Sequence, residues 1–239
     1  KANKRLKGIT LLQGGEVNIK SDGSMDMKNS VLKDLDIDVA TEGKVLNSLK
    51  FNEFVFHPNM ILNIQRGWDS FDDYLSAITS KYRVRAKRAF KKAKDIEKIE
   101  LTAERLEIAN NEIYQLYKNV ANQASFNMVS LGENYFLELK RQLGDAFQIF
   151  GFYNQSELVG FYTTIVNEDE LEAHFLGIDG PTNRKTQLYL NMLFEMIKQG
   201  IELKKHKVVF ARTAMEIKSS VGAVPKQLHG YIRGNQKLI

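Results

Sequence analysis

The chain has 239 residues, 43% of them apolar and 26% charged, and this composition is typical of a globular protein with a core. No apolar run approaches the roughly 20 residues that a membrane helix needs, and the absence of Cys excludes disulfides, thiolate metal sites and a Cys nucleophile. With a net charge of +5 and four His that lie apart from metal-binding spacings, we expect a cytoplasmic protein that has no signal peptide, holds no metal and favours anionic partners.

The first part of the chain predicts short strands separated by loops. The stretch "GITLLQGGEVNIK", residues 8–20, predicts two strands about a turn at Gly14 and Gly15. The stretches "FNEFVF" and "NMILNIQ", which flank a His-Pro pair, predict two more strands. Residues 31–50 show partial helical spacing that Gly43 interrupts, so the sequence does not assign them.

A basic amphipathic helix follows these strands. Ser70, with an Asp three positions later, predicts a capping box at the start of a helix. Residues 81–94, "KYRVRAKRAFKKAK", then contain eight Lys or Arg and no acid, and their apolar residues recur at helical spacing. The cationic side of this helix, on which Arg83, Lys87 and Lys91 fall along one line, is either a solvated surface or a site that binds an anion.

From residue 103 onward the pattern predicts alternating helices and strands. Two helices are expected first, at residues 103–122 and over "ENYFLELKRQLG", which Gly144 ends. Three strands in an antiparallel meander come next, and then a long helix whose apolar face includes Leu193, Phe194 and Ile197. A strand, a short helix that Gly222 caps and a last strand follow. Their sequences are "AFQIFGFYN", "ELVGFYTTIVN", "ELEAHFLGI", "TNRKTQLYLNMLFEMIKQGIELKK", "HKVVFAR", "TAMEIKSSVGA" and "LHGYIR".

This order of elements resembles the GNAT (Gcn5-related N-acetyltransferase) fold, and more narrowly its Fem-type branch for peptidoglycan biosynthesis and recognition. The resemblance covers roughly residues 68–231. It is carried by "KYRVRAKRAFKKA", "ENYFLELKRQLGDAFQIFGFYNQSELVGFYTTI", "LEAHFLGID" with "LYLNMLFEMIKQGIE", and "RTAMEIKSSVGAVP". It implies an α/β (α+β) fold with a mixed, mostly antiparallel sheet flanked by helices. We expect two related half-domains: a truncated one at residues 1–98, with the basic helix, and a GNAT-like domain at residues 99–239.

The resemblance implies a bacterial enzyme that transfers an acyl or aminoacyl group to an amine. The donor would be an acyl-CoA such as acetyl-CoA, or an aminoacyl-tRNA, and both carry phosphates. The acceptor would be a small molecule or a peptide such as a peptidoglycan precursor. The alternative is a non-catalytic binding module of the same fold, which would hold an anionic polymer or a nucleic acid through residues 81–94.

The stretch "GIDGPTNRKTQ" stands where GNAT enzymes bind the phosphates of the donor. Gly177, Gly180, Arg184 and Lys185 are the candidate ligands, because glycines permit close approach of the backbone and cations attract phosphate. The second half of the usual glycine pattern is absent, which leaves a plain loop as the alternative.

Three residues are candidates for catalysis. Glu172 and His174 share one face of a strand on which GNAT enzymes often carry a general base, and a solvated surface pair is the alternative. Lys218 stands where many GNAT enzymes have a Tyr and where Fem-type proteins have a Lys. It would stabilise the negative charge of the tetrahedral intermediate or hold a phosphate, unless it is a plain surface Lys.

Overall fold

The computed structural model of the chain contains two compact units. The described residues are 43–55, 57–123 and 130–233, together with the backbone of four strands before residue 43. One unit consists of residues 1–59 and 226–239, and the other of residues 60–225. The boundary between these units lies at residue 59, and the basic helix packs on a helix of the larger unit. The two related half-domains divided at residue 98 stay a prediction.

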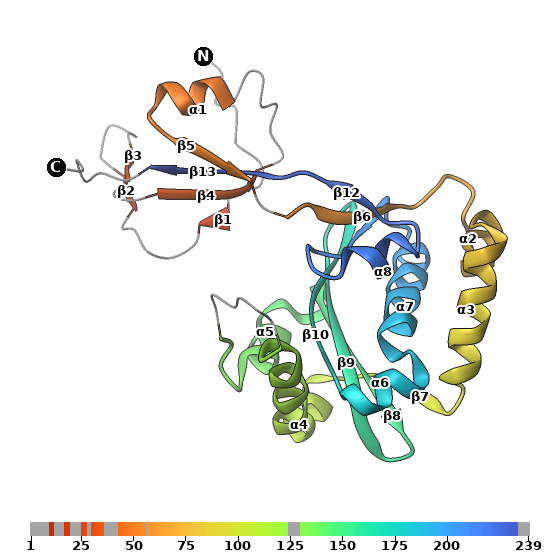
Figure 1. Cartoon of the computed structure of the whole chain (residues 1–239). Coiled ribbons are helices and arrows are strands. Elements are labelled where there is room, and N and C mark those ends of the chain that lie inside the picture. The colour runs from red at the N-terminus through yellow and green to blue at the C-terminus, as the bar shows by residue number, and fades with distance from the viewer. Residues whose placement is uncertain are drawn as a thin grey trace. The chain divides into compact units, whose positions relative to one another are not determined.

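The smaller unit holds a four-stranded antiparallel sheet (Figure 1). Its strands, in spatial order, are β1 (Thr10–Leu11), β4 (Ser30–Leu35), β13 (His229–Arg233) and β5 (Asn52–Val55). Its other described elements are α1 (Lys44–Ser48) and a hairpin of β2 (Val17–Ile19) and β3 (Met25–Met27). β1 and β2 do not pair with each other, and the turn expected at Gly14 and Gly15 lies outside the described residues. β13 belongs to this sheet, although the sequence places it in the GNAT-like domain.

The larger unit is built on a seven-stranded sheet. Its strands, in spatial order, are β12 (Val224–Lys226), β6 (Asn59–Asn63), β11 (Lys207–Val209), β10 (Glu170–Ile178), β9 (Glu157–Val166), β8 (Phe147–Asn154) and β7 (Ile96–Glu100). β10 and β11 are parallel, whereas the pairs β6–β11, β9–β10, β8–β9 and β7–β8 are antiparallel. The expected mixed, mostly antiparallel sheet is confirmed, and so is the meander of β8, β9 and β10.

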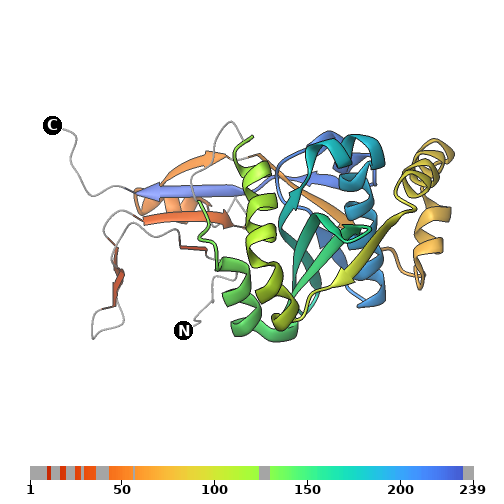
Figure 2. The same ribbon diagram turned by 90° about the horizontal axis from the view of Figure 1, so that it is seen from below.

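Helices cover both faces of this sheet (Figures 1 and 2). One face carries α4 (Ala103–Ala121) and α5 (Tyr135–Leu143), which a 3₁₀ turn at Gly144–Ala146 follows. The other face carries α2 (Phe71–Ala77), α3 (Ser80–Lys92), α6 (Gly180–Thr186) and α7 (Leu188–Glu202). The short helix α8 (Met215–Ser219) follows β11. Because both faces are covered, the central strands are buried on both sides and read as nearly continuous apolar runs.

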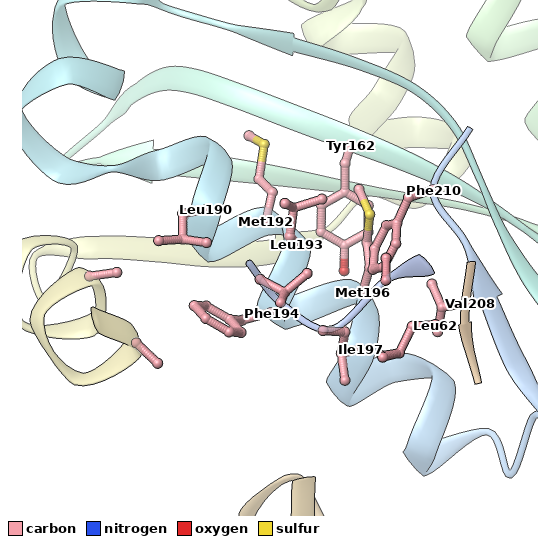
Figure 3. Close-up of a cluster of buried hydrophobic side chains, with 14 of the residues drawn as sticks. Leu62, Tyr162, Leu190, Met192, Leu193, Phe194, Met196, Ile197, Val208 and Phe210 are labelled. Carbon is pink, nitrogen blue, oxygen red and sulfur yellow. The ribbon is translucent and has the colours of Figure 1, made fainter. Parts of the chain in front are cut away.

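The main core lies between the sheet and α7 (Figure 3). The predicted inner face of α7 is confirmed, since Leu193, Phe194 and Ile197 are buried against Tyr162 and Phe210. A second cluster lies under α4 and α5 on the opposite face. The sheet is thus fixed from both sides, and this rigidity positions the residues along β10.

The capping box at Ser70 is confirmed. The Asp73 N–H donates to Ser70 Oγ at 3.3 Å, and the Ser70 N–H donates to Asp73 Oδ2 at 2.8 Å. The apolar seam of the basic helix is also confirmed, because Ala86 and Ala89 of α3 are buried. α3 therefore packs through small residues and leaves its cationic side outward.

The expected long helix is in fact two helices, α6 and α7. Gln187, whose backbone angles are left-handed (φ 55°, ψ 41°), separates the two helices. The side-chain amide of Asn191 donates to the carbonyls of Gln187 at 3.0 Å and of Thr186 at 3.3 Å. These carbonyls at the end of α6 are therefore hydrogen-bonded. The same amide also donates to the carbonyl of Ala89, so the break is tied to α3. Sequence periodicity did not reveal it, because residues 182–187 are all polar and carry no apolar spacing that a break could interrupt.

Candidate active site

The large sheet divides between its two parallel strands. β10 and β11 pair only over residues 170–172 and 207–209, although β10 continues to Ile178. Beyond β11 the chain follows β6 instead, because the Phe210 N–H donates to the Met60 carbonyl at 2.8 Å and the Met60 N–H donates to the Ala211 carbonyl at 3.0 Å. The two parallel strands therefore part after three residues.

A β-bulge lies in β10 where the strands part. From Ala173 to Leu176, β10 advances three residues while its partner β9 advances two. The Thr163 hydroxyl of β9 accepts a hydrogen bond from the Phe175 N–H at 2.8 Å and donates to its carbonyl at 2.9 Å. Ala173 and Leu176 pack toward α7, whereas Phe175 and the intervening His174 both lie against the aromatic side chains beneath α4 and α5. Regular alternation would have put these two on opposite faces.

A pocket of about 290 Å³ lies at this division. Its walls are residues 173–176 of β10, the end of the α4 helix, the first half of α7 and the segment after β11. The lining is mostly apolar, with Tyr117, Leu193 and Phe210 among its larger side chains, and it includes His174 and Lys218. The structure thus brings together two of the three residues that the sequence nominated for catalysis.

His174 is held by a tyrosine from α5. Its Nε2 shares a hydrogen bond of 2.8 Å with the Tyr135 hydroxyl, and the two rings stack with centroids 5.9 Å apart. Burial lowers the pKa of His174 from 6.5 to about 4, so the imidazole is neutral at neutral pH. It can accept a proton, but it is a weaker base than its ordinary pKa would make it.

Lys218 is buried. The residue is 4% exposed, and its Nζ donates to the carbonyl of Phe210. Burial lowers the pKa of Lys218 from 10.5 to about 8, so the amine is mostly charged at neutral pH. The backbone around it is ordered by the Val221 and Ala223 N–H groups, which donate to the Lys218 carbonyl at 3.2 and 3.1 Å. A plain surface Lys, the alternative left open by the sequence, does not fit this burial.

The other predicted residues lie outside the pocket lining. Glu172 is half-buried on β10, opposite Val209, and does not line the pocket. Gly177 has a packing role, because a Cβ there would lie 2.5 Å from the Leu116 carbonyl carbon and 2.6 Å from the Tyr117 nitrogen of α4. A role for either residue in transfer stays a prediction.

The remaining donor-binding candidates belong to α6. Gly180 is the first residue of this helix, whose N-terminus is already capped because the Thr182 N–H donates to the Asp179 carboxylate at 2.8 Å. Arg184 and Lys185 are exposed in its last turn, where cations complement the helix dipole. Their role as phosphate ligands stays a prediction.

The anion-binding candidates of α3 have different surroundings. The Arg83 guanidinium donates to the carbonyls of Leu75, Ser76 and Ile78 at 2.9 to 3.0 Å, so it supports the end of α2. Lys87 and Lys91 are exposed. Anion binding by these residues stays a prediction.

Tyr135 was not a sequence candidate. It lies 39 residues before His174, and its partnership depends on the bulge and on how α5 packs, neither of which the sequence signals. Within the described ranges, no three His, Asp or Glu side chains gather as metal ligands. In the same part of the chain, no helix is both long and apolar enough to span a membrane.

No family model matches the chain, and no curated protein matches it by sequence. Solved structures do match it. FemX superposes with a TM-score of 0.60 at 11% identity and covers 84% of this chain and 71% of its own. The chain has the GNAT-like fold, with Fem-type proteins among its structural relatives.

Two further structures share this GNAT-like fold. L-PGS from Bacillus licheniformis has a TM-score of 0.57 at 11% identity, over 94% of this chain and 85% of that one. The C-terminal domain (DUF2156) of a putative lysylphosphatidylglycerol synthetase from Agrobacterium fabrum has a TM-score of 0.54 at 9% identity, over 91% and 83%. At such identities the likeness establishes the fold and not the chemistry.

Proposed function

We propose that the chain is an acyltransferase, which moves an acyl or aminoacyl group from a phosphate-bearing donor to an amine in the pocket between β10 and β11. The donor is an acyl-CoA, such as acetyl-CoA, or an aminoacyl-tRNA. The observation that carries the proposal is a buried Lys218 cation beside a neutral His174 in a largely apolar pocket. FemX and the domain of a putative lysylphosphatidylglycerol synthetase, both among the structural relatives, support it.

The chemistry follows from the charges that form during transfer. The neutral amine attacks the carbonyl carbon of the thioester or ester, a C–N bond forms, and the carbonyl oxygen becomes negative. Lys218 stabilises this oxygen, and does so strongly because the surroundings exclude water. His174 accepts the proton from the new ammonium, with Tyr135 orienting its ring, and the C–S or C–O bond then breaks as the leaving group takes up a proton.

The acceptor is an amine on a small molecule or a peptide, of which a peptidoglycan precursor is one example. The proposed donors are cytoplasmic molecules, and we propose a bacterial cytoplasm as the location. Amines are cationic in water, so the acceptor must lose its proton before it can attack. The buried charge of Lys218 favours this, because it disfavours a second cation nearby.

A Lys218→Met variant tests the proposal. We expect donor-dependent transfer to an amine mixture to fall about 100-fold, because one stabiliser of the oxyanion is lost. Release of free thiol or of deacylated tRNA measures this rate. Lys198→Met, on the same face of the sheet but outside the pocket lining, is the control and should keep the full rate. Equal rates in both variants would remove Lys218 from the mechanism.

The alternative function is a binding module for an anionic polymer or nucleic acid. It is favoured by the exposed cations of α3 and by the capped N-terminus of α6, where the Thr182 N–H is already bound to Asp179 and is not free for a donor phosphate. Salt-sensitive RNA binding with no donor-dependent turnover would favour this function.

The double variant Lys87→Gln/Lys91→Gln tests the α3 surface under either function. If these side chains contact phosphates, the slope of log K against log salt for tRNA should become shallower by about 1 to 2, measured by filter binding. Lys118→Gln, on α4 at the opposite face of the sheet, is the matched control. A double variant with the slope of the unmodified chain would contradict phosphate contact by α3.

A further inference from the structure

The pocket is lined mainly by apolar side chains. Apolar side chains come from α4, β10, α7 and the segment after β11, with Val120, Leu176 and Met196 among them. No Asp or Glu is among the described residues that line it. The volume of about 290 Å³ is roughly twice that of an apolar cavity that accepts benzene, so it has room for about ten non-hydrogen atoms.

One cation stands in this apolar space. Within the part of the chain that the structure describes, the Lys218 ammonium donates to the Phe210 carbonyl, and no carboxylate lines the pocket beside it. An ammonium has three N–H donors and a full charge, and a single carbonyl satisfies one donor and none of the charge. A negative or strongly polarised oxygen on a ligand would supply what the protein does not.

We propose that the pocket selects ligands in which an apolar body of about six to ten carbons adjoins a carboxylate or an acyl carbonyl oxygen, and that this oxygen binds Lys218. The inference rests on the proposed function for its biological meaning, because it assigns an apolar acyl group as the group transferred. Ligands with a cationic head are excluded, since they would place two positive charges together in an apolar space. Free acids and acyl esters share this chemistry.

Three probes that share an eight-carbon chain and differ in their head group separate the contribution of the head group to affinity from that of the chain. Octanoate, octanol and octylamine are titrated into the full chain at pH 7, with affinities measured by calorimetry. We expect octanoate to bind at least tenfold more tightly than octanol, because its head forms a charge-assisted bond, and octylamine to bind least tightly. Methyl octanoate, which has the acyl oxygen without the charge, should fall between octanoate and octanol.

Two variants connect the selectivity to the pocket. Lys218→Met should weaken octanoate at least tenfold and leave octanol within about twofold, because it removes the head-group partner and keeps apolar volume. Ala121→Leu, at the pocket end of α4, should weaken both probes about tenfold by filling the space. Lys198→Met and Ala103→Leu, which lie outside the lining, are the matched controls and should change neither affinity; circular dichroism checks that each variant is folded.

Several results would overturn the inference: equal affinities for the three heads, preference for octylamine, undiminished octanoate binding in Lys218→Met, or no binding of any probe. These measurements need no catalysis, so they separate the two claims. Octanoate selectivity without donor turnover would leave the pocket assignment standing and reject the transferase. Turnover with acetyl donors alone, without probe selectivity, would support the transferase and reject the assignment of the pocket to apolar acyl groups.

Discussion

A Gly177→Ala variant will be destabilised by about 3 kcal/mol or more, which corresponds to a fall in melting temperature of about 6–12 °C for a domain of this size. The added methyl group would lie 2.4 Å from the Phe161 ring and within 2.6 Å of two backbone atoms of α4. A side-chain tip can rotate away, but the helix backbone can move only if α4 shifts as a whole. Denaturant unfolding of both proteins measures the difference.

Gly180→Ala is the control for this experiment. The nearest heavy atom to a Cβ at Gly180 is the Arg184 Nη1 at 3.5 Å, an ordinary contact, and the residue is the first of a helix. We expect a change of less than about 1 kcal/mol, with the sign favouring Ala. If the two variants were equally stable, the close approach of α4 to β10 would not be as described. Because α4 supplies Tyr117 and Ala121 to the pocket, Gly177→Ala should also weaken octanoate binding.

Lys218→Met will stabilise the fold at pH 7 by up to about 3 kcal/mol. The pKa of Lys218 is about 8 in the folded chain and 10.5 as the ordinary value, so burial of the charged amine opposes folding by roughly this amount. Below pH 8 both states are protonated and the full cost applies. Between pH 8 and 10.5 the unfolded chain binds more protons than the folded one, so Lys218 becomes less destabilising as pH rises.

The measurement for this prediction is the difference in unfolding free energy between Lys218→Met and the unmodified chain from pH 7 to pH 11. The gain from Met should shrink over the window from pH 8 to 10.5 and vanish above it. Taking the difference cancels the contributions to the unfolding free energy from other groups that titrate in this range. A gain that stays constant with pH would show that the buried charge is not its cause.

The fold could be predicted largely because its signals are local. The inner face of α7 and the Ser70 capping box depend on residues within a few turns of each other, and both are as expected. The break at Gln187 was missed because its cause is the amide of Asn191 reaching across to α3, a tertiary contact. Gly177 was assigned to phosphate from its place in a loop-like motif, whereas its surroundings give it a packing role against α4.

The candidate site could be predicted only in part, for a related reason. Lys218 and His174 were found because each stands at a recognisable place in the order of elements. The bulge that turns His174 toward Tyr135 is a change of register between two strands, and a single sequence does not encode register visibly. The depressed pKa of His174 follows from that burial, so it could not be expected from the sequence either.

The hydroxyl of Tyr74 in α2 donates to the carbonyl of Val221 at 2.9 Å. The backbone of Met60 accepts a hydrogen bond from the Phe210 N–H and donates one to the Ala211 carbonyl. Residues from early in the chain therefore fasten the late segment that carries the Lys218 ammonium and its carbonyl partner. A shortened protein that starts at residue 99 would keep every nominated catalytic side chain and still have an unanchored lysine. A shortened chain that is meant to keep the pocket should therefore retain the residues from Met60 onward.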